Sequence, residues 1–138
     1  MIRLHDALSK RPDAKLVLST GNVGFLVTRL MLLLGQFNYG KRGILDMTHT
    51  RLFTFTSVRR LLEQSGFRIV ETRGVPGPFP LAMGGSWLSR MLVRVNKALI
   101  RLSRGMFSYQ IFIVAQPIPS LDYLLQDAET QSSIRAQK

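Results

Sequence analysis

Residues 53–72 constrain the fold more than any other part of the sequence, because they predict a helix with both ends marked and a strand directly after it. Thr54 is a residue type that caps the free amides of a first helical turn. Gly66 stands where a helix ends in a left-handed residue, and Phe67 is expected to pack back on that end. Residues 68–72 then predict a strand. The helix has one apolar face, which is formed by Val58, Leu61 and Leu62.

Helical and strand-like segments alternate through the rest of the chain. Helices are predicted at residues 2–9, 25–34 and 86–104, strands at 15–20 and 107–115, and a short helix at 121–128 before a polar tail. The nearly continuous apolar character of residues 15–20 predicts burial on both faces, as in a parallel sheet. Residues 25–34 are dense in apolar side chains, so we expect this helix to be covered on most sides, with Phe25, Met31 and Leu32, Leu33 and Leu34 in the core. The order predicts an α/β layered fold.

The composition narrows the classes of function. The chain has 138 residues, and its 46% hydrophobic content suits one globular domain. It contains no cysteine, which excludes thiolate metal sites and cysteine nucleophiles. The two histidines, His5 and His49, lie far apart and have no carboxylate at ligand spacing, so no metal site is predicted. Residues 23–34 are too short to span a bilayer, and we expect a cytoplasmic location.

The charge is strongly unbalanced. Nineteen Lys and Arg stand against 8 Asp and Glu, which gives a formal net charge of +11. Such an excess attracts anionic partners, among them nucleic acids, acidic membrane surfaces and phosphorylated substrates. The basic residues lack the aromatic interleaving of proteins that bind single strands, so nucleic acid is the least favoured of the three.

Four short pieces of the sequence carry a family resemblance. Residues 15–22 read KLVLSTGN, residues 43–54 read GILDMTHTRLFT, residues 61–67 read LLEQSGF, and residues 107–117 read FSYQIFIVAQP. In this order they resemble the C-terminal half of a bacterial class I S-adenosylmethionine (SAM) dependent methyltransferase, with Gly21 in place of the usual proline before Asn22. The resemblance covers residues 5–117 and implies three strands, the last one antiparallel, with about four helices.

The resemblance also implies what this chain lacks. Members of the family bind SAM at a Gly-rich turn after the first strand, with an acidic residue at the end of the second strand. Neither occurs in these 138 residues. We therefore expect residues 1–119 to form a partial methyltransferase domain on the substrate side, followed by a tail at 120–138. SAM is the implied cofactor, but we expect a truncated or split protein that is inactive alone.

The long polar loop at residues 36–50 is where we expect the chemistry. His49 is the predicted catalytic residue, since an imidazole can deprotonate a substrate hydroxyl before methyl transfer. The other interpretation is a loop histidine that hydrogen-bonds the backbone. The predicted substrate-binding residues are Asn22, Tyr39, Arg42, Asp46, Thr48 and Arg51. Their alternatives are a turn asparagine, a solvated loop face, and an internal polar network that holds the loop in shape.

The predicted helix at residues 86–104 is amphipathic and basic. Its apolar face predicts packing on the protein, a lid over the substrate site, or insertion at a membrane surface. The residues expected to meet an anionic membrane are Trp87, Arg90, Arg94, Lys97 and Arg101. The alternative function is therefore a non-catalytic module that binds the inner face of the membrane through this helix.

The predicted strand at residues 15–20 has a further consequence. If it is the fifth strand of a methyltransferase sheet, its outer edge has no neighbour within these residues. An open apolar edge invites pairing with another chain. We therefore expect a homodimer, or pairing with a separate N-terminal half.

Overall fold

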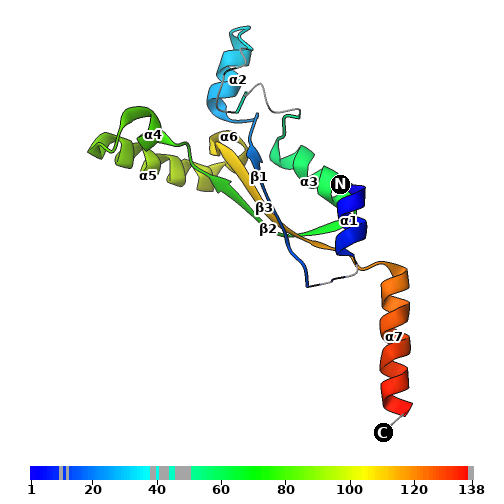
Figure 1. Ribbon diagram of the computed structural model, residues 1–138. Helices are drawn as coiled ribbons and strands as arrows, with labels where there is room; N and C mark the ends of the chain where they lie inside the picture. The colour runs from blue at the N-terminus through cyan, green and yellow to red at the C-terminus, as the bar shows by residue number, and fades with distance from the viewer. Residues whose placement is uncertain (10, 12, 38–39, 41–43, 46–50, 137–138) are drawn as a thin grey trace.

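The computed structural model describes residues 1–9, 11, 13–37, 40, 44–45 and 51–136 (Figure 1). The helices are α1 (Ile2–Leu8), α2 (Leu26–Leu33), α3 (Phe55–Gln64), α4 (Phe79–Met83), α5 (Trp87–Leu102), α6 (Arg104–Phe107) and α7 (Leu121–Ala136). The strands are β1 (Leu16–Gly21), β2 (Phe67–Val75) and β3 (Gln110–Pro117). The predicted mixture of helices and strands is confirmed. The short helices α4 and α6 were not predicted from the sequence.

The three strands form one sheet in the order β1-β3-β2. Strand β3 lies in the middle and is antiparallel to both neighbours, with Leu18 opposite Ile113 on one side and Thr72 opposite Ile113 on the other. Strands β1 and β2 therefore run in the same direction. Parallel strands need a long crossover between them, and the segment that contains α2 and α3 provides it (Figure 1).

One face of the sheet carries the hydrophobic core. Alternate residues of β3 are buried because successive side chains of a strand point to opposite faces. They meet the apolar face of α3, and Leu8 of α1 packs against the same cluster. The buried members of the core are Val58, Leu62, Phe67, Ile111, Ile113 and Ala115.

Helix α3 begins and ends as its sequence predicts. The Thr54 hydroxyl accepts a hydrogen bond from the Ser57 amide at 3.2 Å, and the Ser57 hydroxyl accepts one from the Thr54 amide at 2.8 Å. This reciprocal capping box satisfies two free amides at the start of the helix. Gly66 follows the helix with φ of +82°, a conformation that side chains rarely adopt. The chain turns there and enters β2 with Phe67 buried.

The prediction that β1 is buried on both faces is wrong. Its side chains alternate between half-buried and exposed, and Val17 is 59% exposed on the face opposite the core. The physical reason is that the described part of the chain covers only the core face of β1, so Val17 on the other face meets solvent. Strand β1 is also an edge strand of the sheet. Only β3 pairs with it among the described strands, so its other edge is open.

The prediction that the helix at residues 25–34 lies in the core is also wrong for most of its length. Within α2 only Thr28 is buried. Leu32, Leu33 and Leu34 are exposed, Leu33 by 81%, while Phe25 and Met31 are half-buried. An apolar composition predicted a covered helix, but α2 extends beyond the end of β1, away from the sheet (Figure 1).

The C-terminal half differs from its prediction mainly in element length. Strand β2 continues to Val75, and β3 begins at Gln110, because α6 runs to Phe107 and two further residues precede the strand. Helix α5 starts at its cap Ser86, whose hydroxyl accepts a hydrogen bond from the Ser89 amide at 3.3 Å. The final helix α7 runs to Ala136 and points away from the sheet (Figure 1).

Candidate functional site

The anchored parts of the long polar loop gather at the carboxyl end of β1. Gly21 ends the strand, and a side chain at this position would contact the backbone of Ile44 at 3.4 Å. Ile44 and Leu45 are buried, so the loop is held at that end by its own apolar residues. The chain returns to the same place at Phe53, which forms a parallel bridge with Asn22. Val23 donates its amide to the Phe53 carbonyl at 2.9 Å.

Asn22 holds this end of the sheet together. Its side chain is fully buried, and its amide group donates to the carbonyls of Gly105 at 3.0 Å and Ser108 at 2.8 Å. Its side-chain oxygen accepts the Gly24 amide at 3.0 Å. The backbone amide of Asn22 adds a bond to the Tyr109 carbonyl at 2.9 Å. The side chain is therefore occupied by the protein itself, and it ties the turn after β1 to the segment that leads into β3.

Of the other residues predicted for the substrate site, the structure describes only Arg51. Arg51 is exposed just ahead of the bridge residue Phe53. The predicted catalytic residue His49 lies outside the described residues. So do four predicted substrate-binding residues, namely Tyr39, Arg42, Asp46 and Thr48. These predictions stay predictions.

A shallow hollow of about 390 Å³ lies beside the start of α3. It is lined by residues between 53 and 64, among them Thr54, Ser57 and Arg60. The hydroxyls of Thr54 and Ser57 face each other in the capping box, so they are engaged with the helix start. Arg60 is exposed and brings a positive charge to the hollow.

The predicted membrane-surface residues lie together on α5. All five are exposed, and Trp87, Arg90, Met91 and Arg94 line a second hollow of about 600 Å³. The residues by which α5 meets the rest of the protein are different ones, since its buried residues are Ser89, Asn96 and Ile100. The interpretation of this helix as a lid over the substrate site stays a prediction, because most of the predicted site residues lie outside the described residues.

Asn96 is a buried residue that the sequence analysis missed. Its side-chain oxygen accepts the Gly77 amide at 3.0 Å, and its amide group donates to the Phe107 carbonyl at 2.9 Å. It thereby fixes α5 to the connector after β2 and to α6. A polar residue between cations on a helix gives no sequence signal for such a role, because its partners are backbone groups.

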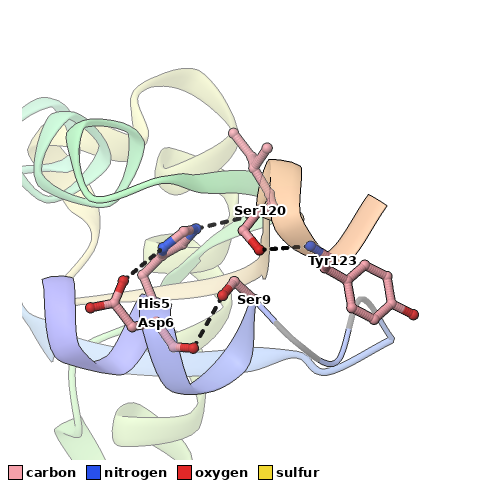
Figure 2. Close-up of polar contacts among 6 residues, drawn as sticks. His5, Asp6, Ser9, Ser120 and Tyr123 are labelled. Atoms are coloured by element: carbon pink, nitrogen blue, oxygen red, sulfur yellow. Dashed lines mark hydrogen bonds and ion pairs between the residues drawn. The ribbon is translucent and has the colours of Figure 1, made fainter. Parts of the chain in front are cut away.

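His5 belongs to a second polar cluster (Figure 2). His5 contacts Ile118 just after the end of β3, whereas Asn22 contacts Tyr109 just before the start of that strand. The Nε2 atom of His5 donates to the carbonyl of Ile118 at 3.0 Å, and its Nδ1 lies 3.7 Å from the Asp6 carboxylate. The edge of the ring packs against Phe67, with ring centres 5.5 Å apart. Ser120 accepts the amide of Tyr123 and so caps the start of α7 (Figure 2). The cluster joins α1 to the end of β3.

Comparisons with known proteins add no family. A scan against protein-family models and a search of curated proteins both gave no match. Within the described part of the chain, none of the helices combines the length and the apolar character needed to cross a bilayer.

Proposed function

We propose that this chain is the substrate-side half of a class I SAM-dependent methyltransferase and is inactive without a SAM-binding half. The observation that carries the proposal is the sheet. The sequence resemblance implies a last strand antiparallel to the two before it, and β3 is antiparallel to both β1 and β2. The Rossmann-like assignment rests on this arrangement together with the ordered sequence pieces.

The location of the loop anchors supports the same proposal. In open α/β sheets, ligands bind in the crevice outside the carboxyl ends of the strands. The bridge between Asn22 and Phe53 lies at that end of β1, and buried Ile44 holds the loop there. His49 would then act as general base on the acceptor, with Arg51 nearby in the chain as a contact for an anionic group.

The sheet itself supports a missing neighbour, because β3 alone pairs with β1 among the described strands. We propose that the open edge of β1 pairs with a strand of the SAM-binding half, or with a second copy of this chain.

A pair of matched variants tests the edge. Val17→Lys places a charge on the exposed face of β1, and Val70→Lys places the same charge on the other edge strand, where Val70 is also exposed. We expect light scattering to detect an assembly that V17K disrupts and V70K leaves intact. A wild-type chain that is strictly monomeric and highly soluble would contradict pairing along β1.

Calorimetry with SAM tests the enzymatic side. We expect no heat of binding when SAM is titrated into the chain alone, because the chain has no Gly-rich turn to cradle the cofactor. Binding of SAM, or transfer of a labelled methyl group by the chain alone, would refute the inactive-half proposal.

The second candidate function is binding to an anionic membrane surface through α5. The specific observation that favours it is the exposure of Trp87, by 69%, beside the exposed cations Arg90 and Arg94. Co-sedimentation with vesicles tests it. Equal pelleting with neutral and anionic vesicles, or none with either, would count against this function.

A further inference from the structure

Helix α5 buries two polar residues, Ser89 and Asn96, with one apolar residue, Ile100, while a row of its apolar residues is exposed. Buried Ser89 donates its hydroxyl to the Ser86 carbonyl at 2.8 Å. Buried Asn96 binds the backbone of Gly77 and Phe107. An amphipathic helix that served packing alone would bury its apolar row instead. The hydrogen bonds of Asn96 and the burial of Ile100 therefore hold α5 in an orientation that leaves its apolar row outside.

Exposed apolar residues lie on α4 as well as on α5. On α5, Trp87, Met91, Val95 and Leu102 follow one another in steps of four or seven residues, which places them along one side of the helix. Leu81 in α4 is 89% exposed and Leu102 at the far end of α5 is 80% exposed. The α4–α5 hairpin projects from the end of the sheet, on the opposite side of the molecule from α1 and α7 (Figure 1). The exposed apolar residues of the hairpin include Leu81, Met83, Trp87, Met91, Val95 and Leu102.

A row of cations runs beside the apolar row. Arg90, Arg94, Lys97 and Arg101 are all exposed, and each directly precedes an apolar residue of the helix. Neighbouring residues of a helix are about 100° apart, so the two rows lie side by side. The sequence has no Asp or Glu between Glu71 and Asp122 that could neutralise the cations.

We propose that the α4–α5 hairpin is a docking surface for an anionic phospholipid bilayer. Leu81, Met83 and Trp87 enter the boundary between head groups and acyl chains, and Arg90 and Arg94 bind lipid phosphates at the mouth of the hollow that they line. This inference rests on the second candidate function and names its surface. Charge alone would also suit a nucleic acid, but a nucleic acid backbone gives exposed leucine and methionine side chains no apolar partner.

The test uses Trp87 as its own reporter, because it is the only tryptophan of the chain. The full chain is titrated with vesicles of phosphatidylcholine, alone or with about one third phosphatidylserine, while fluorescence and pelleting are measured. We expect binding and a blue shift of the emission only with the anionic vesicles, and the binding to weaken as salt is raised.

Two charge-matched variants locate the surface. R90Q/R94Q removes two exposed cations from α5. R3Q/R11Q removes two exposed cations at α1, since Arg3 lies in this helix and the Arg11 amide donates to the carbonyl of Leu8 at its end. Helix α1 lies on the other side of the molecule from α5 (Figure 1). Each cation near an anionic surface strengthens binding about fivefold, so R90Q/R94Q should weaken it about 30-fold. We expect R3Q/R11Q to change it by less than about threefold, since distant charges are screened.

The outcomes separate this inference from the function it rests on. Absence of binding to anionic vesicles would refute both. Binding that persists with no shift of Trp87, or that R90Q/R94Q and R3Q/R11Q weaken equally, would leave membrane binding in place and refute this surface. Gel retardation of DNA by the wild type, lost in R90Q/R94Q and unaccompanied by vesicle binding, would assign the cations to nucleic acid and overturn the proposal.

Discussion

Replacing Asn22 with alanine should destabilise the fold by about 3 kcal/mol. Its side chain makes three hydrogen bonds, to the carbonyls of Gly105 and Ser108 and from the amide of Gly24. Each such bond contributes about 1 kcal/mol net, and its loss leaves a partner without a hydrogen bond in a buried place. Two of the three bonds join segments more than eighty residues apart in the chain, so their loss loosens the contact between β1 and the start of β3.

Asn22→Asp sharpens this prediction. The aspartate keeps the acceptor for the Gly24 amide but turns a carboxylate oxygen toward the two carbonyls of Gly105 and Ser108. A carboxylate cannot donate a hydrogen bond and repels those oxygens, so the variant should lose at least as much stability as the alanine.

Urea unfolding measures both losses, with the free energy extrapolated to water. Arg51→Ala is the matched control, because Arg51 is a predicted substrate contact that lies exposed on the surface. It should change stability by less than about 0.5 kcal/mol. A loss below about 1 kcal/mol for Asn22→Ala, or an Asn22→Asp variant as stable as wild type, would refute the argument that Asn22 serves the scaffold.

Four further substitutions, the first of them paired with His5→Ala, test local geometry by the same assay. Gly66→Ala should lower the free energy of unfolding by about 2 kcal/mol or more, because φ is +82° and the new Cβ would lie 2.6 Å from the His5 ring. Adding His5→Ala should recover part of that loss, and losses that simply add in the double variant would contradict the contact. Gly74→Ala should also destabilise the fold, because its Cβ would overlap the Ser108 hydroxyl. Ser108→Ala should be neutral or stabilising by about 1 kcal/mol, because that buried hydroxyl has no hydrogen-bond partner among the described residues, and a marked loss would reveal one. Thr54→Ala should cost about 1 kcal/mol, and no change would contradict its role as a helix cap.

The sequence predicted best where the signal is local. Thr54 and Gly66 mark the two ends of α3, because each residue type is favoured in the backbone geometry of a helix end. Both lie where they were expected. The strand β1 was found within one residue for the same reason, because β-branched and aliphatic residues suit an extended chain.

The sequence failed where the answer depends on a distant neighbour. Periodicity states which residues of α5 share a side, but not which side meets the protein. Asn96 contributes to that choice, and its partners are backbone groups of Gly77 and Phe107. The prediction failed in the same way for the exposed leucines of α2 and for Val17 of β1. Apolar composition predicts that a residue is buried, but it does not tell which segment of the chain covers that residue. In the candidate site, Asn22 was predicted to bind substrate because it follows a strand, and neither its burial nor its bonds to Gly105 and Ser108 could be read from that position.

The most direct test of the proposed function is a SAM titration of two proteins by calorimetry. One is this chain alone, and the other is the chain joined to the segment encoded directly upstream of Met1. We predict no binding to the first and measurable binding to the second, with the upstream segment supplying the Gly-rich turn and the acidic strand end. SAM binding by the chain alone, or no binding by the joined protein, would contradict the proposal that this chain is the substrate-side half of a methyltransferase.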